Sequence, residues 1–237
     1  MVGLFVVFEG GDGVGKSTQT GLLCDWLEAA GREVVRTFEP GEGPIGAQIR
    51  RIVLSPETEN LAPRAEALLF AADKAQHVHA IVRPALERGA VVVSDRYVDS
   101  TLAYQGAGRV LALADLEHIN RWATHELRPH LTVLLDLEPA LGVGEKDEPD
   151  RLEALAAGFH ERARQAFLDL AEADPARYLV VPAREPVEVI ADAVRARVGA
   201  LLDHPDHSPP EVGRRGLLQA LFHPDEEVSE AAGSMDA

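Results

Sequence analysis

The residues from position 10 to position 18 have the types and spacing of a phosphate-binding loop. In order they are Gly10, Gly11, Asp12, Gly13, Val14, Gly15, Lys16, Ser17 and Thr18. The glycines permit backbone twists that turn successive N–H groups inward, which makes a concave site for an anion. The pattern predicts that Lys16 lies along the β- and γ-phosphates of a nucleotide and that the Ser17 hydroxyl ligates Mg²⁺.

The residues on either side of this loop predict a strand before it and a helix after it. The apolar run 4–8 is short and rich in residues that favour strands. After Ser17 the apolar residues recur at helical spacing, and Gly31 is placed to end the helix. The plainer interpretation is a glycine-rich turn without a ligand, but the strand and the helix are the context that a phosphate loop requires.

The length and charge of the chain limit the class of protein that it can be. Its 237 residues can build one sizeable α/β domain with a short appendage. The formal net charge of -16 argues against a nucleic-acid-binding surface. No apolar run approaches membrane-spanning length, and Met1 leads directly into a strand. We therefore expect a cytoplasmic protein with no nucleic-acid or membrane partner.

Five short apolar runs alternate with helical patterns over the first 203 residues. The expected strands are 4–8, 33–38, 90–94, 131–137 and 178–181, and the expected helices include 63–82 and 186–202. This alternation predicts an α/β fold, a five-stranded parallel sheet with helices on both faces, in which ligands bind at the carboxyl ends of the strands. Residues 204–237 are acidic and rich in proline at their start, so we expect a linker and a largely disordered tail.

The third expected strand ends in an acid followed by a base, Asp95 and Arg96. Because ligands of open α/β sheets bind beyond the carboxyl ends of the strands, both side chains are expected at a ligand site. The plainer interpretation is a structural ion pair between these two neighbours. Their place at the ligand edge of the sheet favours the functional interpretation.

Four stretches in register resemble the thymidylate kinase family. They are 8–18 with an acidic residue at Asp12, 37–41 with Gly46 and Arg50 downstream, 95–106, and 150–153 followed by Phe159. The resemblance covers about residues 4–202 and implies the P-loop nucleotide-kinase fold for a domain of residues 1–203. It also implies a lid at about 138–151, phosphoryl transfer from ATP to dTMP with Mg²⁺ as cofactor, and a homodimer.

The resemblance further implies roles for single residues. Arg50 and Arg96 would bind the dTMP phosphate, and Asp12 would approach the 3′-hydroxyl. The residues expected to face the nucleoside are Phe70, Lys74, Thr101, Tyr104 and Gln105. Asp95 would join Ser17 in the Mg²⁺ shell. The plainer interpretations are a solvated charge on a helix for Arg50 and simple core packing for Phe70.

The chain departs from the family pattern at three places. Phe38 and Lys74 stand where arginine is usual, and a lysine cannot make the bidentate contact of a guanidinium. Residues 141–150 of the lid contain no arginine, and Gly13 cannot supply the phosphate-loop arginine of some family members. Arg151 is therefore expected to complete the catalytic set of Lys16, Asp95 and Arg96. The other candidates for the missing arginine are Lys146, Arg162 and Arg164.

These departures leave two alternatives to a dTMP kinase. One is a nucleotide-binding regulatory protein that has kept the fold but transfers phosphate poorly, because residues 141–150 of the lid contain no arginine. The other is a kinase for a different nucleoside monophosphate, because Lys74 and Phe38 leave room for a changed base preference.

Overall fold

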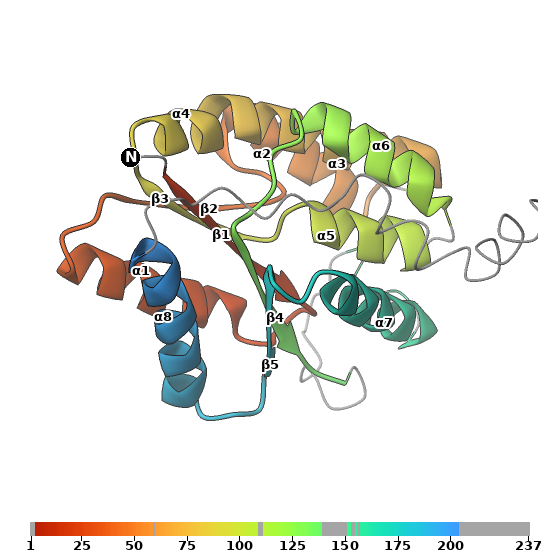
Figure 1. Ribbon diagram of the computed structural model, residues 1–237. Helices are drawn as coiled ribbons and strands as arrows, with labels where there is room; N and C mark the ends of the chain where they lie inside the picture. The colour runs from red at the N-terminus through yellow and green to blue at the C-terminus, as the bar shows by residue number, and fades with distance from the viewer. Residues whose placement is uncertain are drawn as a thin grey trace, which may run out of the picture.

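A computed structural model describes residues 3–58, 60–108, 111–138, 151–152, 155 and 157–203 of the chain. Five strands form one sheet, and each neighbouring pair in it is parallel. The strand order is β2-β3-β1-β4-β5, which places β1 at the centre (Figure 1). The strands are β1 Leu4–Gly10, β2 Val34–Phe38, β3 Val91–Asp95, β4 Leu131–Asp136 and β5 Tyr178–Pro182. The expected five-stranded parallel sheet is confirmed.

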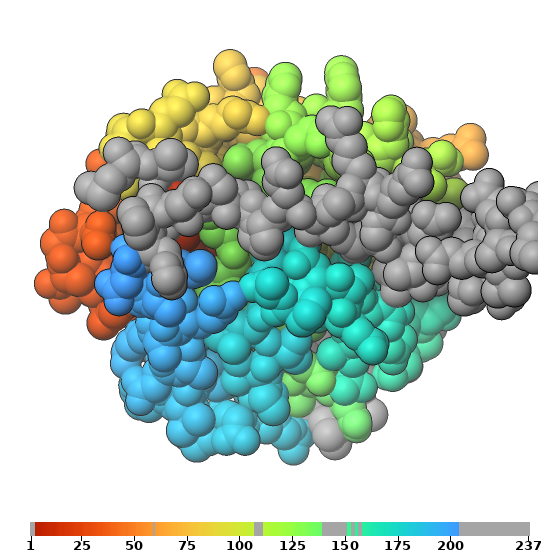
Figure 2. All heavy atoms as spheres, in the orientation of Figure 1, coloured from red at the N-terminus to blue at the C-terminus, as the bar shows by residue number. Residues whose placement is uncertain are grey.

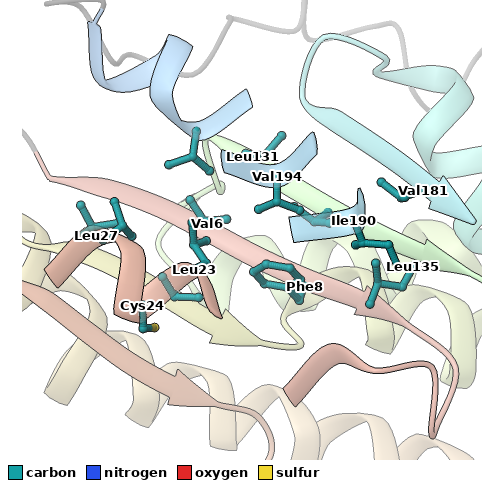
Figure 3. Packing of buried hydrophobic residues seen from close by; sticks show 14 of the residues in the cluster. Val6, Phe8, Leu23, Cys24, Leu27, Leu131, Leu135, Val181, Ile190 and Val194 are labelled. Atoms are coloured by element: carbon teal, nitrogen blue, oxygen red, sulfur yellow. The ribbon is translucent and has the colours of Figure 1, made fainter. Parts of the chain in front are cut away.

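The central strand β1 is buried along its whole length and supplies side chains to both faces of the sheet. Val6 and Phe8 pack with α1 (Lys16–Ala29) and α8 (Val187–Asp203), as Figure 3 shows. Phe5 and Val7 belong to a second cluster that contains Val82. Since successive side chains of a strand point to opposite faces, both faces of β1 are covered, which explains its continuous apolar sequence.

The remaining helical elements follow the other strands. They are α2 Gly43–Leu54, α3 Pro63–His77, η1 Val78–Val82, α4 Arg83–Glu87, α5 Val98–Thr101, η2 Leu102–Gly108, α6 Leu113–Ala123 and α7 Ala157–Ala173. Figure 1 shows α1 and α8 on one side of the sheet and α3, α4 and α6 on the other. In the space-filling view, the last part of the described chain, in teal to blue, fills the lower part of the visible face (Figure 2). None of the helices that the structure describes is long and apolar enough to cross a membrane.

Two helical regions differ from the sequence prediction. The helix expected over 63–82 continues through the π-helical segment η1 into α4 and ends at Glu87. Pro84 lies near the start of α4. Proline has no N–H and cannot donate the regular hydrogen bond of an α-helix, so a change to π-helical geometry just before it is consistent with the missing bond. The second region, 98–108, was given no element from the sequence and is helical in α5 and the π-helical η2.

The boundaries of the other elements agree with the prediction to within a few residues. The helix after the phosphate loop ends at Ala29, and Gly31 has the left-handed φ of 75° that suits a residue beyond a helix end. The expected lid, apart from its end residues Glu138 and Arg151, and the tail 204–237 lie outside the described residues. Both remain predictions.

Candidate active site

The phosphate loop has the backbone that its glycines predict. Gly10, Gly13 and Gly15 have φ angles of 128°, 72° and 96°, which L side chains rarely adopt. A Cβ atom on Gly10 would lie 2.4 Å from the carbonyl oxygen of Leu135 on β4, so the close approach of the strands also requires glycine there. The loop then leads into α1 at Lys16.

The Lys16 ammonium group lies inside this loop. Its Nζ donates to the carbonyl oxygen of Gly10 at 3.1 Å and also to that of Gly11. The pKa of Lys16 is lowered to about 8, mainly by burial and secondly by the charge of Arg96. The charges of Asp95 and Asp12 act in the opposite direction and raise it. A phosphate bound in the loop would add negative charge and stabilise the protonated lysine.

Ser17 and Asp95 form the pair expected to hold Mg²⁺. The Ser17 hydroxyl donates to Asp95 Oδ2 at 3.2 Å, which joins the first turn of α1 to the carboxyl end of β3. A hydroxyl and a carboxylate are hard oxygen ligands, and Mg²⁺ usually takes only one or two protein ligands beside phosphate and water. The two residues therefore fit a Mg²⁺ site.

Arg96 has a left-handed φ of 73°, and its guanidinium reaches back to the phosphate loop. Its Nη2 donates to Asp12 Oδ1 at 2.6 Å, while Nη1 donates to the carbonyl oxygen of Gly10 at 3.1 Å and to Ser100 Oγ at 3.0 Å. The ion pair thus joins Arg96 to Asp12 and not to its neighbour Asp95. The guanidinium also lies 5.3 Å from the centre of the Tyr104 ring. Arg96 therefore connects the phosphate loop to the next pocket.

Glu9 accepts hydrogen bonds from the residues that follow Arg96, and the sequence analysis gave it no role. Its Oε1 accepts the backbone N–H groups of Tyr97 at 2.9 Å and Ser100 at 3.2 Å, and its Oε2 accepts the Ser100 hydroxyl at 2.6 Å. The side chain is fully buried, and burial, with a smaller effect of Asp99, raises its pKa to about 7. An acid at the end of a buried apolar strand is the sequence signal that could have found it.

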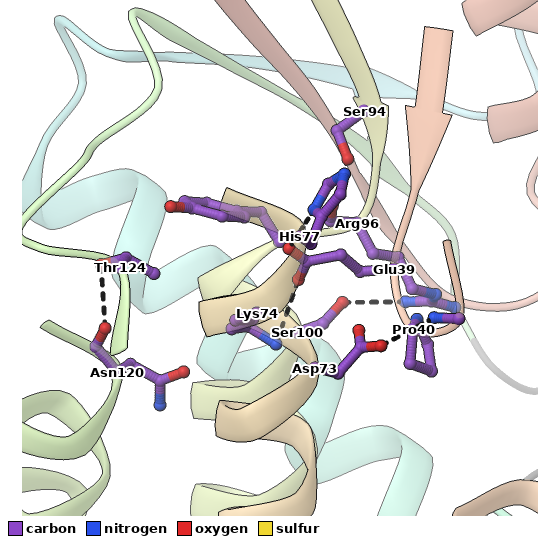
Figure 4. Close-up of polar contacts among 12 residues, drawn as sticks. Glu39, Pro40, Asp73, Lys74, His77, Ser94, Arg96, Ser100, Asn120 and Thr124 are labelled. Atoms are coloured by element: carbon purple, nitrogen blue, oxygen red, sulfur yellow. Dashed lines mark hydrogen bonds and ion pairs between the residues drawn. The ribbon is translucent and has the colours of Figure 1, made fainter. Parts of the chain in front are cut away.

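A buried cluster of charges lies at the end of β2 (Figure 4). Glu39 Oε2 lies 3.2 Å from Lys74 Nζ, and Glu39 Oε1 lies 2.7 Å from His77 Nδ1. The other ring nitrogen of His77 lies 2.7 Å from Thr37 Oγ1. Burial alone would raise the pKa of the Glu39 carboxyl, but Lys74 and His77 hold it below its usual value.

The side chain of Lys74 is therefore fixed where arginine is usual in the family. It is 2% exposed, and its ammonium lies 5.8 Å from the centre of the Phe70 ring. Next to it, Asp73 Oδ1 accepts the N–H of Gly41 at 3.1 Å. The pKa of Asp73 is raised to about 6, mainly by burial and secondly by the charge of Glu39.

The phosphate loop and this pocket open into one cleft of about 970 Å³. Predicted site residues that line it are Asp12, Gly13, Gly15, Lys16, Ser17, Thr18, Arg50, Phe70, Lys74, Asp95, Arg96, Thr101, Tyr104 and Gln105. Within it, Arg50 donates to the carbonyl oxygen of Pro40 at 2.6 Å, and the Thr101 hydroxyl is buried without a hydrogen-bond partner. One cleft thus brings together the predicted donor and acceptor residues.

A few predicted residues are not among those that line the cleft. Gly10, Gly11 and Val14 are the phosphate-loop residues that do not line it. Arg151 is bound elsewhere, since its guanidinium donates to the carbonyl oxygen of Val53 and pairs with Glu66. Its role as the missing catalytic arginine stays a prediction.

The cleft is also lined by residues to which the sequence analysis gave no role at the site, among them Arg36, Glu39 and His160. Arg36 Nη2 donates to the carbonyl oxygen of Ser17 at 2.9 Å. Arg36 and Glu39 follow from the rule that polar residues near the carboxyl end of a parallel strand face the ligand. No local signal marks His160, which comes from α7.

A parallel sheet with a phosphate loop and a second polar pocket in the same cleft defines a P-loop nucleotide kinase. The family model described as thymidylate kinase matches residues 8–194. The chain is 58% identical to the thymidylate kinase of Clavibacter sepedonicus over 206 residues, which cover 85% of this chain and 97% of that relative. It is 54% identical to the thymidylate kinase of Cutibacterium acnes, over 86% of this chain and 100% of the relative.

A solved structure has the same fold. The crystal structure of thymidylate kinase from Ehrlichia chaffeensis matches with a TM-score of 0.70 at 27% identity, over 84% of this chain and 100% of that chain. The chain therefore belongs to the thymidylate kinase family of enzymes.

Proposed function

We propose that the protein transfers the γ-phosphoryl group of ATP to dTMP, which gives ADP and dTDP for dTTP synthesis. The observation that carries this proposal is the single cleft in which the phosphate loop and the Phe70 and Lys74 pocket meet. The Arg96–Asp12 ion pair of 2.6 Å lies between these two parts. Relatives that are 58% and 54% identical to this chain are named thymidylate kinases, which supports dTMP as the acceptor.

On the donor side, the loop N–H groups and Lys16 would bind and orient the ATP phosphates. Ser17 and Asp95 would hold Mg²⁺, which supplies positive charge for the phosphates of ATP when it is bound. Phosphoryl transfer asks little covalent chemistry of the protein, so the task of these residues is to align the phosphates and neutralise their charge.

On the acceptor side, Arg50 and Arg96 would bind the dTMP phosphate, since a guanidinium matches its oxygens. Asp12 would accept a hydrogen bond from the 3′-hydroxyl. Phe70 would stack on thymine, above the Lys74 ammonium. The remaining residues for the nucleoside are Thr101, Tyr104 and Gln105.

The exposed apolar side chains support the proposed homodimer. Ile45 and Ile52 on α2, Leu68 on α3 and Trp122 on α6 are 51%, 43%, 55% and 79% exposed. The helix α3 packs against both α2 and α6, and exposed large apolar side chains on helices that pack together are typical of an interface. Sedimentation should give twice the chain mass of 25.6 kDa, and Trp122→Glu should shift the protein towards the monomer. A monomer at all concentrations in the unchanged protein would contradict the proposal.

No comparison favours the two alternatives, a regulatory protein that transfers phosphate poorly or a kinase for another monophosphate. We propose a cytoplasmic location, because the substrates ATP and dTMP belong to nucleotide metabolism.

The test is an ADP-release assay with ATP and Mg²⁺ that offers dTMP, dUMP, UMP, CMP, AMP and GMP in parallel. We expect turnover on dTMP well above that on the other five. Absence of turnover on every acceptor, while ATP and dTMP still bind by calorimetry, would support the regulatory alternative. Higher turnover on another acceptor would support the alternative kinase.

A further inference from the structure

We propose that Glu66 and Arg151 are positioning residues that orient the side-chain amide of Gln105 for selection of the acceptor base. The inference rests on the proposed function, because it assumes that the base binds beside Gln105. It gives Arg151 a role different from that of the missing catalytic arginine.

The first step concerns the contact between Gln105 and Glu66. Gln105 lies in η2, lines the cleft and is 2% exposed, and its Nε2 donates to Glu66 Oε1 at 3.0 Å. Glu66 lies in the first turn of α3 and is fully buried. The two side chains are 39 positions apart in the sequence.

The second step concerns which end of the amide faces the carboxylate. A carboxylate only accepts hydrogen bonds, so Glu66 binds the NH₂ end of Gln105 and leaves the carbonyl oxygen for a ligand. That oxygen accepts the N3–H of thymine or uracil, whereas the corresponding nitrogen of cytosine carries a lone pair and repels it. The orientation of the amide therefore favours pyrimidines that carry a proton at N3.

The third step concerns how Glu66 is kept in place. Arg151 pairs through Nη2 with Glu66 Oε2, the carboxylate oxygen that Gln105 does not bind. The same guanidinium donates to the carbonyl oxygen of Val53 from Nε at 2.9 Å and from Nη2 at 2.8 Å. The Arg151 N–H also donates to the carbonyl oxygen of Leu54 at 3.2 Å.

These contacts attach Arg151 to the end of α2, where helix carbonyl groups lack partners within the helix and attract a cation. Arg151 thereby stabilises the buried charge of Glu66 and fixes the plane of its carboxylate. The chain of contacts runs from the end of α2 through Arg151 and Glu66 to Gln105. It reaches the acceptor pocket and not the phosphate loop.

The kinetic test separates this role from that of a catalytic arginine. The variants are Glu66→Gln, Arg151→Met and the double variant, with Arg88→Met as the control, because Arg88 pairs with Glu33 on the surface. In Glu66→Gln the new amide can also donate, so the orientation of Gln105 is no longer fixed. Each variant is measured for kcat and KM with ATP and with dTMP, and for its preference for dTMP over dCMP.

We expect each single variant to raise the KM for dTMP about 10-fold, as the loss of one oriented polar contact does. The preference for dTMP over dCMP should fall by a similar factor, while the KM for ATP stays unchanged. The double variant should be no worse than either single variant, because both remove the same contact chain. Arg88→Met should behave as the unchanged protein.

A loss of kcat in Arg151→Met without a change in the KM for dTMP, together with normal kinetics in Glu66→Gln, would overturn the inference and favour a catalytic arginine. Unchanged base preference in Glu66→Gln would also overturn it. If Arg151→Met does not fold, as judged by its thermal melt, Glu66→Gln and Arg151→Lys decide the question in the same way. An unchanged protein that does not phosphorylate dTMP would instead overturn the proposed function.

Discussion

The phosphate-loop part and the acceptor part of the cleft are built in different ways. The phosphate loop comes from one continuous stretch, 10–18, and its shape depends on backbone angles at glycines. The acceptor part comes from β2, α2, α3, α5 and η2, and it depends on buried side-chain pairs in and beside the cleft. A local backbone site can be recognised from sequence, whereas a site of long-range pairs becomes visible only in the fold.

The difference also concerns how charge is handled. In the phosphate loop, the Lys16 ammonium donates hydrogen bonds to backbone carbonyl groups, and a bound phosphate would supply its negative partner. In the acceptor part, Lys74 already has a buried partner in Glu39, and Arg151, which does not line the cleft, has one in Glu66. Changes in the phosphate loop should therefore reduce turnover, and changes in the acceptor part should mainly reduce stability, dTMP affinity or base preference.

The largest effect is expected from Lys16→Ala. Removal of the charge that would lie along the transferred phosphate should lower kcat about 10³-fold, because a positioned charge is used in the transition state. The measurement is ADP release at saturating ATP and dTMP, with the exposed Arg32→Ala as the control. Undiminished turnover in Lys16→Ala would refute the assignment of the phosphate loop.

The next effect is one of stability, from Glu39→Gln. This variant leaves Lys74 without its charged partner in a buried cluster, and the free energy of unfolding at pH 7 should fall by about 3 kcal/mol. Glu33→Gln, which breaks the exposed pair with Arg88, should cost less than about 1 kcal/mol. Urea titration measures both.

The pKa of Glu39 determines how that difference depends on pH. It is lower in the folded protein than the ordinary value of 4.5, so the stabilisation is complete above pH 4.5 and is lost as the pH falls through the folded pKa. The gap between the unchanged protein and Glu39→Gln should therefore narrow below pH 4.5. A gap that is equal for Glu33→Gln and Glu39→Gln at pH 7 would contradict the importance of the buried cluster.

A smaller effect, on substrate affinity alone, is expected from Phe70→Ala. Loss of an aromatic ring that stacks on a base costs about 1–3 kcal/mol, so the KM for dTMP should rise about 10-fold or more while the KM for ATP is unchanged. Phe70→Tyr keeps the ring and should stay close to the unchanged protein. Equal KM values for dTMP in Phe70→Ala and Phe70→Tyr would show that Phe70 is only a core residue.

The smallest effect concerns Glu9. Its pKa of about 7 in the fold exceeds the ordinary 4.5, so between these values the folded protein binds a proton that the unfolded chain lacks, and stability falls as the pH rises. The slope is at most about 1.4 kcal/mol per pH unit. Glu9→Gln should remove this contribution, as unfolding titrations between pH 6 and pH 7 would measure.

Asp73→Asn is the matched control for Glu9→Gln. Its carboxyl has a pKa raised to about 6, so its removal should change the slope mainly below that pH. If Glu9→Gln left the slope near pH 7 as it is in the unchanged protein, the buried Glu9 would not titrate there.

The sequence predicted the sheet and the phosphate loop because glycine spacing and apolar runs are local signals. The acceptor residues Arg50, Phe70, Lys74, Thr101, Tyr104 and Gln105 were expected only from the resemblance to the family. Asp95 and Arg96 were found because they follow a strand, but the partner of Arg96 was not, since Asp12 lies 84 positions away. Glu66 was missed for the same reason, since its contacts are with Gln105 and Arg151, 39 and 85 positions distant. The π-helical η2 was missed because its residues form no 3.6-residue apolar stripe.

The central claim is that the two parts of the cleft hold ATP and dTMP at the same time and that the phosphoryl group moves directly between them. Initial rates over a grid of ATP and dTMP concentrations test it most directly. Double-reciprocal lines that intersect are predicted, since both substrates must be bound before either product leaves. Parallel lines would contradict the claim, because they would mean that ADP leaves before dTMP binds and that the protein carries the phosphoryl group itself.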